Sequence, residues 1–249
     1  MTTRTNLMRA ELRKLTSTKM PWAFLAVLVV ISATTAAAVI FGTDMDGSKA
    51  FIATAADQQS LMAFAANALM GAGLFGAIAV AREYAHGTVV PTFLTSPRRQ
   101  RAMLAQLAAV GVVGGALALV GAGLTIIAVW LSLPTTEYGF MVAAGDVVRI
   151  LAASAFAGAA GAVLGAAVGA LVRNTGGAVT GTVLVLIIAP PLIIQLASDA
   201  ASWVPNTLAT VLSGVGDEVT TLAAGLAIAA WALVPAAIAL AAVQRRDVA

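Results

Sequence analysis

Residues that could carry chemistry are scarce in this chain. It contains one histidine, His86, and no cysteine. A zinc site needs several such ligands, and without cysteine there are no disulfides or thiolate-bound metals. The phosphate-binding pattern GxxxxGK[ST] does not occur, so the chain does not hydrolyse ATP through a P-loop. We therefore expect no catalytic residue, no metal site and no cofactor in this chain, and we do not expect it to be an enzyme.

Composition points to a membrane protein. Hydrophobic residues make up 60% of the chain, charged residues make up 10%, and the mean hydropathy is +0.96. Soluble domains carry about 25% charged residues, so this chain has too few to cover a surface in water. Its 249 residues instead divide into apolar spans of about 20 residues. We predict a single transmembrane domain over residues 1–249.

Six apolar runs predict an all-α membrane protein with six transmembrane helices. Their expected bounds are about 22–41, 58–81, 102–131, 147–172, 178–197 and 222–243. Asp57 is expected to cap the second span. The third run would be about 45 Å long as a helix, so it must tilt or project from a hydrocarbon core of about 30 Å. The first and last three spans do not repeat each other, which disfavours a transporter built from inverted repeats.

The N-terminal segment, residues 1–20, predicts a basic amphipathic helix. Met8, Leu12 and Leu15 recur at helical spacing, while Arg9 and Arg13 lie on another face. Such a helix suits the membrane surface. The alternative is a simple topology signal, carried by the basic residues Arg4, Arg9, Arg13, Lys14 and Lys19.

Charge asymmetry predicts the orientation. The N-terminal segment, the stretch 82–101, Arg173 and the tail hold twelve of the fourteen basic residues, and only Lys49 and Arg149 lie on the other side. By the positive-inside rule, both termini and the stretch 82–101 face the cytoplasm. We expect a multi-pass protein of the cell membrane, plasma or inner.

Small and polar residues stand out within the spans. Gly161, Gly165 and Gly169 are four residues apart and line one face of the fourth helix, which predicts close helix packing, within the chain or against another subunit. Asn67, Gln106 and Gln195 are the notable polar side chains in or near spans. Interhelical hydrogen bonding is the simpler reading for them, and contact with a transported molecule is the alternative for Asn67.

The segment Ile193–Leu212 is expected not to cross the membrane completely. Pro190–Pro191 is expected to break the end of the fifth span just before it, and Trp203 and Pro205 lie within it. This composition fits a short re-entrant or surface helix, with an ordinary loop as the alternative. Trp231 falls in the middle of the sixth span, where core packing is expected.

The stretch 82–101 is polar and basic but has an apolar centre that includes Phe93 and Leu94. Gly87 reads as a turn and Thr88 as a helix N-cap. Ser96–Pro97 would end that helix. A basic loop that only anchors topology would not need Phe93 and Leu94, so the stretch is better explained as a short docking helix.

These residues carry a resemblance. The pattern RE-Y-x-x-GT followed by L-x-S-P-x-R resembles the permease subunits of ABC-2 type ABC exporters, and it stands here as Arg82, Glu83, Tyr84, Gly87, Thr88, Leu94, Ser96, Pro97 and Arg98. The six spans, the basic N-terminal helix, the broken segment before the last span and the terminal RRD agree with that family. The resemblance implies an N-terminal elbow helix, a cytosolic coupling helix and a re-entrant segment. It also implies a second permease subunit, as homodimer or heterodimer, and a separate ATP-binding subunit that holds ATP and Mg.

The function expected from this resemblance is export of an apolar or amphipathic cargo such as a lipid, a drug-like molecule or a hydrophobic peptide. Asn67 is the candidate for the cargo path. The alternatives are a membrane anchor or assembly subunit of an ATPase complex and an ion-coupled secondary transporter, which would need the buried ionisable residues that the spans lack. The expected partner-binding residues are Arg82, Glu83, Tyr84, His86, Gly87, Thr88, Phe93, Leu94, Pro97, Arg98, Arg99 and Arg101.

Overall fold

The computed structural model describes residues 2–88 and 99–245, with only the backbone described for residues 2–6. Helix makes up 83% of these described residues, and no strand occurs among them. Six helical segments among them are long and apolar enough to cross a membrane: Met20–Phe41, Ala55–Ala85, Arg99–Thr135, Ala144–Val172, Thr175–Leu196 and Thr221–Arg245. The predicted all-α class and the six candidate spans are therefore confirmed.

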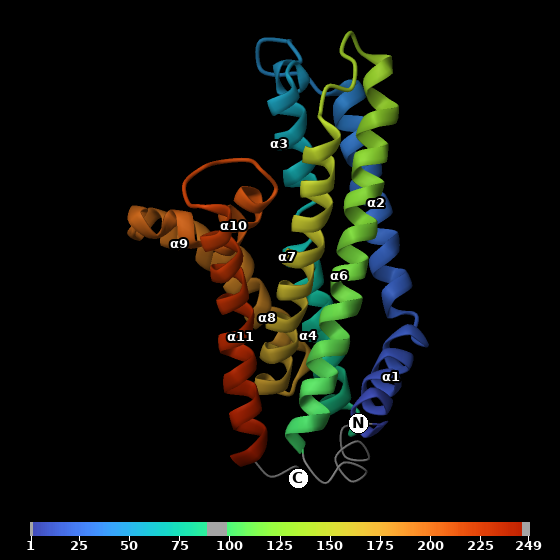
Figure 1. The fold of residues 1–249 in the computed structure, drawn as a ribbon, viewed down its shortest axis with the longest axis vertical. Helices are drawn as coiled ribbons and strands as arrows, with labels where there is room; N and C mark the ends of the chain where they lie inside the picture. Colours follow the sequence, from blue (N-terminus) through green and yellow to red (C-terminus); the bar gives the residue numbers. More distant parts are fainter. Residues whose placement is uncertain (1, 89–98, 246–249) are drawn as a thin grey trace.

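The helices form an elongated bundle around α7 (Ala144–Val172), which contacts α4 (Leu69–Ala85), α6 (Arg99–Ser132) and α11 (Thr221–Arg245). On one side, α2 (Met20–Phe41) packs against α6, and α1 (Thr2–Thr16) packs beside the first turns of α6. Figure 1 shows α1 and the last turns of α11 at the same end of the bundle, where α4 ends and α6 begins. Short 3-10 turns, η1 (Ala50–Ile52) and η2 (Leu133–Thr135), lie in the connections at the other end.

The glycine stripe of α7 lies directly against the backbone of α4. A Cβ atom at Gly161 or Gly165 would collide with the carbonyl oxygen of Leu69 or Gly73, and one at Gly169 would lie 2.7 Å from the carbonyl oxygen of Ala77. Without side chains, the two helices approach until their backbones touch, which is the usual role of small residues spaced by four. The stripe therefore serves packing within the chain.

The second span is not the single helix that we expected. α3 (Ala55–Ala65) and α4 are separated by a break at residues 66–68. The Asn67 side-chain oxygen accepts a hydrogen bond from the Leu69 backbone N–H at 3.2 Å. A short amide side chain that bonds its neighbouring backbone competes with the helical hydrogen bonds, which gives a physical reason for the restart. The start of α3 differs in detail from expectation: Thr54 is the N-cap, and Asp57 lies in the first turn, where it completes a reciprocal capping box with Thr54.

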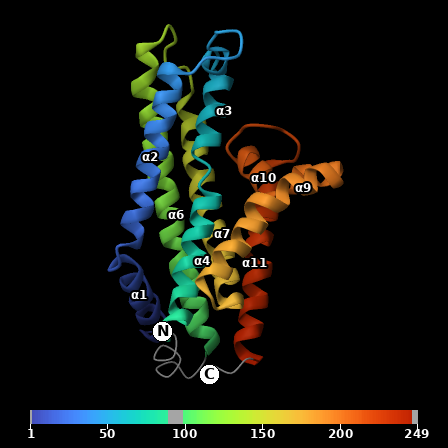
Figure 2. The same cartoon turned by 180° about the vertical axis from the view of Figure 1, so that it is seen from behind.

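The fifth span bends out of the bundle. It runs as α8 (Thr175–Val183), the π-helical η3 (Leu184–Ile188) and α9 (Ala189–Leu196), and α9 points away from the other helices in Figures 1 and 2. The predicted break at Pro190–Pro191 is wrong in detail, because helix continues through both prolines. Pro is tolerated in a first helical turn, and the π-helical segment just before it supplies the bend.

Two short helices, η4 (Ser198–Trp203) and α10 (Pro205–Leu212), precede α11. The eight residues of α10 span only about 12 Å, too little to cross a membrane. The segment is therefore not an ordinary loop, and its expected failure to cross agrees with the length of α10. It is fixed by side chains of the neighbouring helices: Arg149 donates to the carbonyls of Val211 and Leu212 at 3.0 Å, and the Trp231 indole donates to the Trp203 carbonyl at 3.1 Å.

Candidate functional site

The candidate site lies where α1, the end of α4 and the start of α6 meet, at the end of the bundle where α11 also ends (Figure 2). Leu12 and Leu15 of α1 pack against the main apolar core, while Arg9 and Arg13 are exposed. The predicted amphipathic N-terminal helix is therefore present. Its packing brings charged side chains of α1 against the last turn of α4.

Lys14 is the centre of a partly buried ionic cluster at this meeting point. Its ammonium nitrogen lies 3.0 Å from a carboxylate oxygen of Glu11, one turn earlier on α1, and 2.9 Å from a carboxylate oxygen of Glu83 on α4. The Glu11 and Glu83 side chains are only 6% and 14% exposed, whereas Lys14 is 39% exposed. One cation therefore neutralises two nearly buried carboxylates from two different helices.

The pKa of Lys14 reflects this arrangement. Burial lowers it, but the hydrogen bond and charge of Glu83, followed by those of Glu11, more than offset the burial and hold the pKa of Lys14 above its ordinary value. Lys14 therefore stays charged through the physiological range. Gln106 of α6 is nearly buried and its side chain interacts with the same Glu83 carboxylate, so the cluster joins three helices.

Tyr84 extends the cluster to α7. The guanidinium carbon of Arg173 lies 5.3 Å from the centre of the Tyr84 ring, a distance at which a cation is attracted to the aromatic face. Arg173 is the residue that ends α7, with a left-handed φ of 56°. Within the described part of the chain, the Tyr84 hydroxyl is buried without a hydrogen-bond partner.

The chain then turns away from α4. The His86 ring nitrogen Nδ1 lies 2.9 Å from the Arg82 carbonyl oxygen, and the Thr88 hydroxyl donates to the Glu83 carbonyl at 3.3 Å. Gly87 has a φ of +68°, a conformation that favours glycine, so the predicted turn is confirmed. The predicted role of Thr88 as a helix N-cap depends on residues outside the described ranges.

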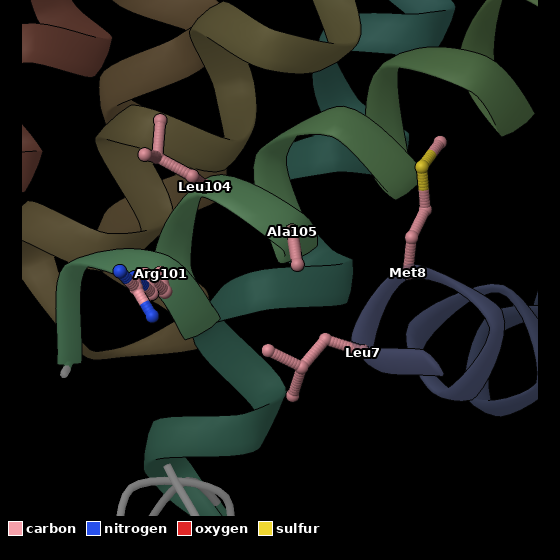
Figure 3. Close-up of a pocket in the computed structure, with 5 residues that line it drawn as sticks. All are labelled: Leu7, Met8, Arg101, Leu104 and Ala105. Carbon is pink, nitrogen blue, oxygen red and sulfur yellow. The ribbon is translucent and has the colours of Figure 1, made fainter. Parts of the chain in front are cut away.

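A groove of about 240 Å³ lies between α1 and the first turns of α6. Figure 3 shows its lining residues: Leu7 and Met8 come from α1, and Arg101, Leu104 and Ala105 come from the first turns of α6. Arg101, the last residue of the stretch 82–101, therefore lies beside the N-terminal helix. Arg82, Arg99 and Arg101 are exposed.

The structure thus brings together several of the residues predicted to bind a partner, while Phe93, Leu94, Pro97 and Arg98 lie outside the described residues. It gives Glu83 an intramolecular ion pair, whereas we had expected this side chain to meet a partner. Glu11 and Lys14 belong to the same site, which was not predicted. Their spacing of three residues on a helix was an available signal for the pair, but nothing in the sequence pointed to Glu83 as the third member.

Asn67 lies at the break between α3 and α4 and lines two hollows, one against α2 and α6 and the other against α10. Gln106 makes an interhelical contact, as expected, and Gln195 is exposed on α9. Across the described residues, no group of three or more acidic or histidine side chains could hold a metal ion. No known family model matches the chain. No curated protein matches it either.

Proposed function

We propose that this chain is the permease subunit of an ABC-2 type exporter, which moves an apolar or amphipathic cargo across the cell membrane. A separate ATP-binding subunit would hold ATP and Mg and hydrolyse the nucleotide. A second permease subunit would complete the path. Both termini and the stretch 82–101 would face the cytoplasm, with α1 as the elbow helix and Ile193–Leu212 as the re-entrant segment.

One observation carries the proposal: Lys14 joins α1 to Glu83 at the start of the stretch 82–101. A stretch that receives force from a partner must transmit it to the spans, and a flexible loop would absorb the movement instead. Here the last turn of α4 is tied to α1 by the ion pair, to α6 through Gln106 and to α7 through Arg173 over Tyr84. A push on the stretch would therefore move several helices together.

The first experiment identifies the partner and measures coupling. The tagged full-length chain is purified from its native membrane, a co-purifying protein with a P-loop is identified, and the two are reconstituted in proteoliposomes. Phe93→Asp should abolish stimulation of ATP hydrolysis, because it places a charge in the apolar centre of the stretch. Arg82→Glu and Arg101→Glu should weaken partner binding, most strongly at low salt.

Lys19→Glu is the matched control, since Lys19 is exposed near the same end but outside the stretch 82–101. If the three substitutions in the stretch behave like the control, the proposed coupling role is wrong. If the partner binds but no apolar cargo changes its rate of ATP hydrolysis, the chain is an anchor and not a permease.

A further inference from the structure

The break between α3 and α4 opens onto a hollow of about 330 Å³. Its walls come from α2, the two halves of the second span and α6, and they are almost entirely apolar; Val27, Leu28, Phe75 and Leu117 are among the lining residues. Along α6 the lining runs from Leu117 to Thr125, about 12 Å of helix. The volume is at the lower end of the range for ligand pockets, enough for one extended chain and small for two.

The polar groups of the hollow are concentrated at the helix break. The Asn67 side-chain oxygen accepts a hydrogen bond from the Leu69 backbone N–H. Among the described residues, no acceptor takes a hydrogen bond from the Asn67 side-chain NH2. Gly71, which also lines the hollow, belongs to the first turn of α4, where backbone N–H groups have no acceptor within the helix. At the end of α3 the Phe64 carbonyl accepts from the Asn67 backbone N–H at 3.2 Å, whereas no described backbone N–H bonds to the Ala65 carbonyl. Thr125, by contrast, is already hydrogen-bonded to Ser32 at 3.2 Å.

The mouth of the hollow indicates where an occupant comes from. Val27 and Ile31 line it and are 55% and 42% exposed on α2, a candidate membrane span. At that depth the surroundings are hydrocarbon, so an occupant must dissolve in the membrane. None of the described lining side chains carries a charge, which disfavours an ionised head group.

We propose that this hollow binds a neutral single-chain amphiphile, an acyl chain esterified to a small hydroxylated head such as glycerol. The chain lies between α2 and α6, the ester carbonyl accepts from the Asn67 amide and the first turn of α4, and a head-group hydroxyl donates to the Ala65 carbonyl at the end of α3. The inference deepens the proposed function by naming a ligand class for it. Binding is measured without the ATP-binding partner, so failure here is distinguishable from failure of the permease proposal.

The test uses the full-length protein in phosphatidylcholine nanodiscs with a monoacylglycerol that carries a diazirine in its chain. After irradiation, mass spectrometry of peptides should place saturable adducts on the α2 and α6 segments around Val27 and Leu117. Unlabelled monoacylglycerol should compete. The corresponding alkyl ether, which lacks the carbonyl, should compete about fivefold less well, because one hydrogen bond of about 1 kcal/mol is lost.

Gly71→Leu tests the position, since a Cβ atom at Gly71 meets nothing within 4 Å and the added side chain fills the hollow. It should weaken labelling about tenfold, the loss expected from displacing roughly two methylene groups of the ligand. Gly123→Leu is the matched control: it also has open space on a helix but does not line the hollow. It should label like the wild type.

Adducts that spread without saturation over exposed faces, for example near Leu233, would mean contact with bulk lipid only and would overturn the proposal. Equal labelling of the Gly71 and Gly123 variants would overturn it as well. If Gly71→Leu does not fold, equal competition by ester and ether still refutes the proposed carbonyl contact. Labelling found in discs with one copy but absent in discs with two would show that a second copy fills the hollow instead.

Discussion

Replacing Lys14 should destabilise the protein more than replacing either carboxylate that it contacts. Lys14→Met keeps most of the side-chain stem but removes the charge. Two nearly buried carboxylates, Glu11 and Glu83, would then lose their shared cation and repel each other. Glu83→Gln, in contrast, leaves the pair of Lys14 with Glu11 in place.

The magnitudes follow from burial. Exposed ion pairs contribute about 0.2–1 kcal/mol, and breaking a fully buried pair costs about 3–5 kcal/mol. Because Lys14 is 39% exposed while its partners are nearly buried, this cluster lies between those limits. We expect a loss of about 2–3 kcal/mol for Lys14→Met and about 1 kcal/mol for Glu83→Gln.

Thermal unfolding in detergent, followed by size-exclusion chromatography of the surviving folded protein, measures the difference. At about 2–4 °C per kcal/mol for a chain of this size, Lys14→Met should lower the apparent Tm by about 5–10 °C and Glu83→Gln by about 2–4 °C. The double variant should lose less than the sum of the two, because Glu83→Gln removes the repulsion that Lys14→Met creates.

The reasoning is refuted if Lys14→Met is no more destabilising than Glu83→Gln, or if the two losses add. Either result would mean that the three charges are independently solvated. Lys19→Met is the control, an exposed lysine just beyond α1, and it should leave the apparent Tm unchanged.

Three further outcomes are expected. Since the pKa of Lys14 is raised above 10.5 in the folded protein, the stability difference between wild type and Lys14→Met should be constant from neutral pH to about pH 10.5 and shrink as the pH rises through the raised value, measured by Tm across alkaline buffers. Gly165→Ala should cost about 1–3 kcal/mol or prevent folding, because the Cβ atom meets rigid backbone of α4; Gly145→Ala, with open space on the same helix, should be neutral or stabilising, and equal losses for the two would contradict the packing. Arg149→Met removes the hydrogen bonds that hold the end of α10, so hydrogen exchange of residues 205–212 should become faster while that of α6 stays unchanged; uniform acceleration would argue against a local role.

The cluster also bears on how an attached partner could act on the spans. The described residues of the stretch 82–101 fall into two groups. Arg82 and Arg101 face solvent, whereas Glu83 and Tyr84 face inward. In the proposed permease the first group meets the partner and the second group carries the movement to neighbouring helices. Substitutions in the first group should change binding, and those in the second should change coupling with binding intact.

The sequence by itself determined the class of the protein and the positions of its spans. Apolar runs of about 20 residues are long enough to cross a membrane. In hydrocarbon the backbone groups must be hydrogen-bonded within each segment, so the six runs predict six helices. The spacing of Gly161, Gly165 and Gly169 likewise predicted a close helix contact, because four-residue spacing puts them on one face. The break at Asn67 was not foreseen, because an amide side chain in an apolar run is compatible with a continuous helix.

Only the tertiary structure decided which charges meet. Glu83 is 69 residues away from Lys14 in the sequence. A glutamate that docks a partner and a glutamate in a buried ion pair cannot be told apart by residue type. The pairing arises because α1 packs beside α6 while α4 ends at the same level of the bundle. That arrangement depends on helix packing over the whole domain, which short-range patterns do not encode, and so the ionic cluster and the hollow at the α3–α4 break could be found only in three dimensions.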